Sequence, residues 1–217
     1  MGQVTISNEI AKRWIHEYTS PEKLTSKKPY AYPAYDNLDT GSGANELNDG
    51  DLLAPALLNS APSVSGFYRF QDMKARLQDV LTAYPDAPLI SLDDDVAQAK
   101  LRTLYRILDE DRADHDRRGQ GGTTLSKILH RKHPKSLPLH DKWVRRCYLG
   151  SDGVPIDQTR PWADYMALVT QAIKTDLTRQ QDEMATLRTA VQGSVKLTDL
   201  RLLDILAWTS KGKSASA

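Results

Sequence analysis

The 217-residue sequence predicts an all-α protein. Apolar residues recur at spacings of three and four over several long stretches, which is the period of a helix with one buried face. No stretch alternates polar and apolar residues as a half-buried strand does, and the chain contains no internal repeat. We therefore expect a single helical domain over residues 1–217, built from one lobe or two.

The expected elements follow from start and stop signals. Ser7 before a helical period predicts a capped helix that ends at Ser20-Pro21, because proline disfavours a helical conformation in the residue before it. A long loop with three tyrosines then covers residues 24–45, and loops of this length are often functional. Further helices are expected over residues 51–58, 64–84, 92–108, 123–132, from about 139 onward, 157–191 and 198–209.

Composition limits the classes of function. Hydrophobic residues make up 40% and charged residues 26% of the chain, as in soluble globular proteins. No apolar run approaches the roughly 18 residues of a membrane span, and the first residues lack the apolar stretch of a secretory signal. We expect a cytoplasmic protein with no membrane partner. The single cysteine, Cys147, excludes an internal disulfide and any metal centre ligated by several cysteines of this chain.

Histidine is the remaining candidate metal ligand. Four of the five histidines fall in one stretch of the chain, from His115 to His140. The closest pair, His130 and His133, is interleaved with Arg131 and Lys132, whose charges oppose a bound cation. We therefore expect neither a metal nor a cofactor.

Positive charge is concentrated in residues 117–146, although the whole chain carries a formal charge of only +1. This segment holds nine basic residues and one acid, a charge of +8 that leaves −7 for the other 187 residues. Such segregation costs self-repulsion unless an anion lies against it, and a nucleic-acid backbone is the usual anion. The alternative is a solvated charge run that pairs with the acidic stretches at 93–95 and 109–116.

Three glycines lie close together in the stretch Gly119-Gln-Gly121-Gly122, between two segments with a helical pattern. Glycine permits positive φ, so the chain can reverse tightly and present backbone N–H groups to a phosphate at the start of the next helix. A plain connector is the alternative. The candidate DNA contacts are Arg118, Gly119, Gly121, Gly122, Thr123, Thr124, Lys127 and Arg145.

The stretch GQGGTTLSKIL is followed by LPLHDKWVRR, so a G-x-G hairpin and a helix precede an aspartate at the start of the next helix. This pattern resembles the helix-hairpin-helix DNA glycosylase superfamily, in a remote and uncharacterised bacterial branch. It gives Gly119 and Gly121 in the hairpin and Asp141 after Pro138, 22 residues beyond Gly119. The resemblance covers about 30 of 217 residues. It implies a glycosylase-like helical fold with Asp141 as the catalytic carboxylate.

The chain departs from the family at two places. Bifunctional members carry a lysine two residues after the second hairpin glycine, where this chain has Thr123. The resemblance therefore implies a monofunctional enzyme without lyase activity. Members with an iron–sulfur cluster carry four cysteines near the C-terminus, which this chain lacks.

Asp141 suits this role by its own chemistry. Breaking a glycosidic bond to deoxyribose builds positive charge on the sugar, and an ionised carboxylate stabilises that charge or activates a water molecule. A place in the first turn of a helix, near Lys142 and Arg145, favours the ionised form. The alternative is that Asp141 only caps a helix.

An extruded base usually meets aromatic faces and a few polar groups. The 24–45 loop offers Tyr32, Tyr35 and Asp36 as candidates for a base pocket, although tyrosines on a long loop often only hold it against the core. Three functions stay open. We favour a monofunctional DNA glycosylase over a non-catalytic helix-hairpin-helix DNA-binding protein, and over a helical protein-interaction domain whose basic segment meets an acidic partner.

Overall fold

The computed structural model describes residues 1–114, 121–150, 154 and 161–216, with the side chains of 112–114 left out. Over these residues the protein is all-helical, which confirms the predicted class. The α-helices are α1 (Asn8–Thr19), α2 (Asp49–Leu53), α3 (Val64–Thr82), α4 (Asp94–Asp114), α5 (Gly122–Lys132), α6 (Lys142–Tyr148), α7 (Trp162–Arg179), α8 (Gln181–Arg188) and α9 (Asp199–Ser210). Short 3₁₀ helices form at η1 (Pro21–Thr25), η2 (Ala54–Leu58) and η3 (Leu89–Ser91).

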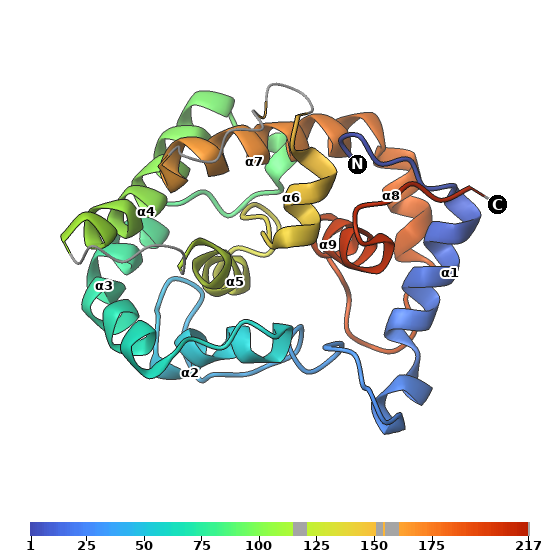
Figure 1. Ribbon diagram of the computed structural model, residues 1–217, viewed down its shortest axis with the longest axis horizontal. Coiled ribbons are helices and arrows are strands. Elements are labelled where there is room, and N and C mark those ends of the chain that lie inside the picture. Colours follow the sequence, from blue (N-terminus) through green and yellow to red (C-terminus); the bar gives the residue numbers. More distant parts are fainter. Residues whose placement is uncertain (115–120, 151–153, 155–160, 217) are drawn as a thin grey trace.

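Helix α5 occupies the middle of the molecule, and the other helices surround it (Figure 1). α4 and α7 pack along one edge, while α2 and η2 form the opposite edge. α6 and α9 lie between α5 and the outer pair α1 and α8. Most residues of α5 are buried, including polar ones such as Ser126 and Lys127. The sequence predicts a helix here, but its central position follows from packing that no local pattern reports.

Polar caps set the starts of several helices. Asn48 and Asp51 form a reciprocal capping box at α2, and the side chains of Ser63 and Thr198 cap α3 and α9. A residue distant in the chain does the same for α7, because the Asp109 carboxylate accepts hydrogen bonds from the first two N–H groups of that helix at 2.9 Å each. These two bonds fasten the start of α7 to α4.

Two expected elements differ from the structure. The helix expected over 157–191 is two helices, because Gln180 leaves the helical conformation at φ −117° and ψ 29°. No proline or glycine marks this break, so the sequence did not reveal it. The helix expected from about residue 139 begins at Lys142, because Leu139 and His140 are buried in the connection that leads to it.

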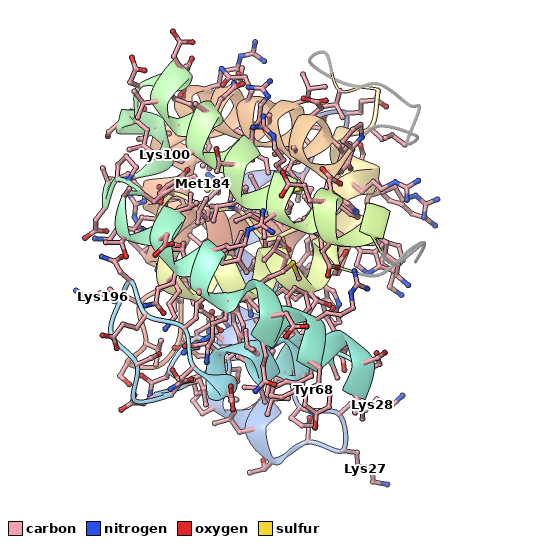
Figure 2. The ribbon with its side chains drawn as sticks, turned by 90° about the vertical axis from the view of Figure 1, so that its left-hand side faces the viewer. Lys27, Lys28, Tyr68, Lys100, Met184 and Lys196 are labelled. Carbon is pink, nitrogen blue, oxygen red and sulfur yellow. The ribbon has the colours of Figure 1, made fainter. Side chains whose placement is uncertain are left out.

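Exposed apolar side chains occur on α2, on η2 and on the first turns of α3. They are Leu53, Leu57, Val64 and Tyr68, of which Val64 and Tyr68 are 76% and 61% exposed. Figure 2 shows Tyr68 at the same end of the molecule as Lys28. These residues are close in sequence to Leu58, whose backbone carbonyl accepts a hydrogen bond from Lys127 in the site described below.

No helix among the described residues is long and apolar enough to span a membrane.

Candidate functional site

Asp141 is the N-cap of α6, and only one of its carboxylate oxygens serves the cap. Oδ1 accepts hydrogen bonds from the backbone N–H groups of Trp143 and Val144 at 2.7 and 2.9 Å. The residue is half-buried, and Oδ2 has no hydrogen-bond partner among the residues that the structure describes. A cap needs a single oxygen, so the second one is free to meet a ligand.

The residue before it, His140, fastens this carboxylate to α5. The Ser126 hydroxyl accepts a bond from the His140 N–H at 3.0 Å, and its own proton can go to the Thr123 carbonyl at 2.8 Å or to the His140 carbonyl at 3.2 Å. The imidazole Nε2 lies 3.0 Å from the Tyr165 hydroxyl. Burial lowers the pKa of His140 to about 3, so its ring is neutral. A rigid, uncharged support therefore holds Asp141 in place.

Lys127 approaches from α5 and is only 5% exposed. Its Nζ donates a hydrogen bond to the Leu58 carbonyl at 2.9 Å. Burial lowers the pKa of Lys127, while the charges of Asp204 and Asp141 act in the opposite direction. Lys127 therefore lies among carboxylates inside the protein, and this placement differs from the surface phosphate contact that the sequence predicts.

A buried arginine, Arg201, organises the other side of the site. It is 2% exposed and donates to both Asp36 oxygens, at 2.7 and 3.2 Å. The same guanidinium donates to Asp204 at 2.5 Å and to the Tyr18 hydroxyl at 3.2 Å. These bonds join α9, α1 and the 24–45 loop.

The loop residues expected to form a base pocket anchor the loop instead. Tyr35 is 1% exposed, and its hydroxyl donates to the Lys127 carbonyl at 2.8 Å. The Tyr32 hydroxyl lies 3.0 Å from two carbonyl oxygens, those of Gln192 and Val195. With Asp36 bound to Arg201, none of the three presents a free face to a base in this conformation. This matches the alternative given above, in which tyrosines hold the loop against the core.

The hairpin glycines permit close packing. Gly121 has φ +150°, and a Cβ there would lie 2.7 Å from Leu108 Cδ1. A Cβ on Gly122 would lie 2.4 Å from three ring atoms of Trp162. Both glycines therefore let the first turn of α5 approach α4 and α7. Two further candidates, Arg118 and Gly119, lie outside the described residues.

The first turn of α5 is open to a cleft of about 280 Å³. Thr124 is half-buried there, and its hydroxyl lies 3.3 Å from that of Ser60. Thr123 is also half-buried but does not line the cleft. The cleft is lined by Gly121 and Thr124 of α5 and by the first turn of α3, so two helix N-termini face it. Both helix dipoles thus favour an anion at this place.

The basic segment divides into inward and outward side chains. Arg131 and Lys132 turn inward to the fully buried Asp51, with N–O distances of 3.7 and 2.8 Å. On α6, Lys142 and Arg146 are exposed and Arg145 is half-buried. Among the described acids of the stretches at 93–95 and 109–116, three form ion pairs with residues outside this segment. These pairs are Asp94–Lys174, Glu110–Arg76 and Asp111–Arg69.

Sequence reasoning missed Arg201 and Asp204, two charged residues of α9. They lie three positions apart, so they share one side of a helix whose other residues are mostly apolar. Two charges inside such a run were the available signal, because buried charges are usually paired or functional. Among the described residues, no group of three or more potential metal ligands gathers in one place.

Comparison with known proteins places the chain in a family. It belongs to the family of unknown function DUF6308, whose model matches residues 11–211. The match covers the site, from the 24–45 loop to α9. No curated protein and no solved structure matches the chain.

Proposed function

We propose that this protein is a monofunctional DNA glycosylase that extrudes a damaged or modified base and hydrolyses its N-glycosidic bond. The observation that carries the proposal is the divided use of the Asp141 carboxylate. One oxygen caps α6, while the other has no partner among the described residues and is available to a ligand.

The chemistry of the site supports this role. As the glycosidic bond breaks, the sugar gains positive charge, and a carboxylate fixed beside it stabilises that charge. Two backbone N–H groups hold Asp141 through its other oxygen, so its position is set before the substrate binds. A water molecule on the same side can transfer a proton to the free oxygen as it attacks the sugar.

DNA contacts are proposed at two places. The first turn of α5, with Thr123, Thr124 and the cleft beside them, suits a phosphate oxygen. The exposed Lys142 and Arg146 of α6 suit neighbouring phosphates. Arg146 also packs near the C-terminal segment, since a Cβ on Gly212 would lie 2.8 Å from it. Lys213 on that segment is exposed and extends the basic surface.

A monofunctional reaction is expected because Thr123 stands where bifunctional members of the helix-hairpin-helix DNA glycosylase superfamily carry a lysine. Lys127, one helical turn further on, is engaged with the Leu58 carbonyl. The product is then an intact strand that carries an abasic site.

The test is incubation of the pure protein with duplexes that contain damaged or hypermodified bases, followed by assays for abasic sites and for strand breaks. Abasic sites in unbroken strands support the proposal. Salt-dependent DNA binding without base release from any duplex contradicts it and favours a non-catalytic DNA-binding protein. Absence of DNA binding contradicts both and favours a protein-interaction domain.

A further inference from the structure

Trp143 on α6 differs from the other three tryptophans of the chain in what surrounds its ring. Trp14 and Trp162 pack against the hydrophobic core, and Trp208 meets two tyrosine rings edge-on, with centroids 5.9 and 5.6 Å apart. Trp143 is half-buried, yet within the described part of the chain it neither packs against the core nor contacts another aromatic ring. The fold therefore does not use this indole as it uses the others.

The side chain that does meet the indole is Lys142. Its Nζ lies 4.5 Å from the centroid of the ring, within the range of a cation–π contact. Lys142 is exposed, and such contacts are weak at exposed sites. A phosphate group can therefore draw the ammonium away from the ring, which leaves the face of the indole open to a flat ligand.

Trp143 lies directly beside the carboxylate of the candidate site. Its backbone N–H donates a hydrogen bond to Asp141 Oδ1 at 2.7 Å. Asp141 Oδ2 has no partner among the described residues and is the oxygen proposed to meet the sugar. A strand that brings a sugar to this oxygen therefore passes the turn of α6 that carries the indole.

The charge around the indole suits a nucleic acid. The seven residues of α6 include three cations and no acid. Lys142 and Arg146 are exposed, and Arg145 is half-buried. An apolar protein surface placed here would leave these charges without partners, which is costly. Proteins that bind unpaired strands combine cations for the phosphates with aromatic rings for the bases, and α6 offers both.

We propose that Trp143 is a stacking site for an unpaired base of the bound DNA. The assignment rests on the DNA binding of the proposed function, and it adds the form of DNA that the site takes. Inside a duplex, neighbouring bases cover both faces of each base, so only a base that has left the stack can lie on the indole. Every base has a π-face, so the site selects unpaired bases rather than a base sequence.

The test compares the binding of two single-stranded oligonucleotides of equal length, one of thymidine units and one of abasic units. Both carry the same phosphates, so only contacts to the bases distinguish them. The parent protein should bind the thymidine strand roughly 5- to 100-fold more tightly, the range expected for one stacked base. The thymidine strand should also quench tryptophan fluorescence. This comparison needs no variant.

Trp143→Leu should bind both strands equally and lose the quenching. Because the indole lies outside the core, this variant should keep the fold, which a thermal melt checks. Trp143→Phe keeps an aromatic face and should keep part of the preference for the thymidine strand. A requirement for apolar bulk alone would instead be met by leucine.

Trp208→Leu is the matched control, because Trp208 is a 38% exposed tryptophan on another helix. It should keep the parent's preference and part of the quenching. Loss of the preference in Trp143→Leu and its retention in Trp208→Leu supports the assignment. Such a result with no base released from any duplex contradicts the glycosylase alone.

Three outcomes overturn the stacking site. Equal binding of the two strands by the parent, or an unchanged preference in Trp143→Leu, contradicts this assignment and not the glycosylase. Loss of the preference in both leucine variants also overturns it, since the effect is then not specific to α6. Absence of binding to any DNA contradicts the stacking site and the proposed function together.

Discussion

At the scale of single residues, the site depends on how completely each carboxylate is hydrogen-bonded. Asp51 binds donors through both of its oxygens and helps to hold the fold together. Asp141 and Asp204 each keep an oxygen without a partner among the described residues. An incompletely satisfied buried carboxylate costs stability, and such costs gather at functional sites. At Asp141 this free oxygen lies on a carboxylate that two backbone N–H groups hold in place, which is the reason for proposing chemistry there.

The cost at Asp204 predicts a stability effect that needs no DNA. Its folded pKa of about 6 lies above the ordinary value, so its contribution is full below about pH 4 and is lost as pH rises through about 6. Asp204→Asn has no such titration. Its free energy of unfolding relative to the parent should therefore increase between pH 4 and pH 7, by on the order of 2 kcal/mol. Denaturant melts at both pH values measure this, and a difference that does not change with pH contradicts the raised pKa.

Only some of these residues could be predicted from the sequence. Asp141 follows from its motif and from its place at a helix start, and the structure puts it there as the N-cap. The structure connects Tyr35 to Lys127 of α5, and it connects Asp36 to Arg201. The roles predicted for these residues assumed exposed side chains, whereas the structure buries Tyr35 and Lys127. Burial depends on long-range packing, which a local pattern of residues does not report. Asp204 was missed because it belongs to no sequence motif, and only the packing of α9 against α6 brings it near Asp141.

At the scale of elements, the first turn of α5 is fixed by contact with α7. Gly122→Ala places a methyl group 2.4 Å from atoms of the Trp162 ring, and the helix or the indole must move. We expect a loss of about 1–3 kcal/mol in the free energy of unfolding, read from the denaturant midpoint.

Gly43→Ala is the matched control for that substitution. The nearest atoms to its Cβ belong to Glu46 at 3.6 Å, an ordinary contact on an exposed loop. Its effect should stay within about 0.5 kcal/mol. Equal midpoints for the two variants would show that the glycine at 122 is not required for packing.

Most helices were predictable because their apolar faces and caps are local. α1 ends before Pro21 as expected, and α9 begins after the Thr198 cap. The division between α7 and α8 at Gln180 was not predictable, since glutamine is an ordinary helix residue. The helical pattern continues on both sides of it, so periodicity alone predicts one helix.

At the scale of the whole molecule, charge is divided between the interior and the surface. The +8 segment suggested one basic face, but Arg131 and Lys132 neutralise the buried Asp51, and Lys127 lies inside. The exposed positive charges discussed above lie on α6 and on the C-terminal segment. Net charge along the sequence therefore overstates the positive surface that is available to the DNA we propose as the partner.

This division predicts different salt responses for two cations. Arg146→Ala should lower DNA affinity and reduce the slope of log affinity against log salt by about 0.9, the value for one lost phosphate contact. Lys127→Met removes a charge that is 5% exposed, so the slope should stay at the parent value. Binding isotherms at several salt concentrations measure both. A lower slope in Lys127→Met would place that side chain on the DNA after all.

The central claim is that the Asp141 carboxylate performs chemistry beyond its cap. Asp141→Asn tests it most directly, because asparagine keeps an oxygen for the Trp143 and Val144 N–H groups and removes only the negative charge. Single-turnover base release is measured beside DNA affinity and a thermal melt. We expect release to fall by about 100-fold or more while binding is kept or slightly strengthened and the fold is intact. Full release in the asparagine variant would contradict the claim and leave Asp141 as a helix cap.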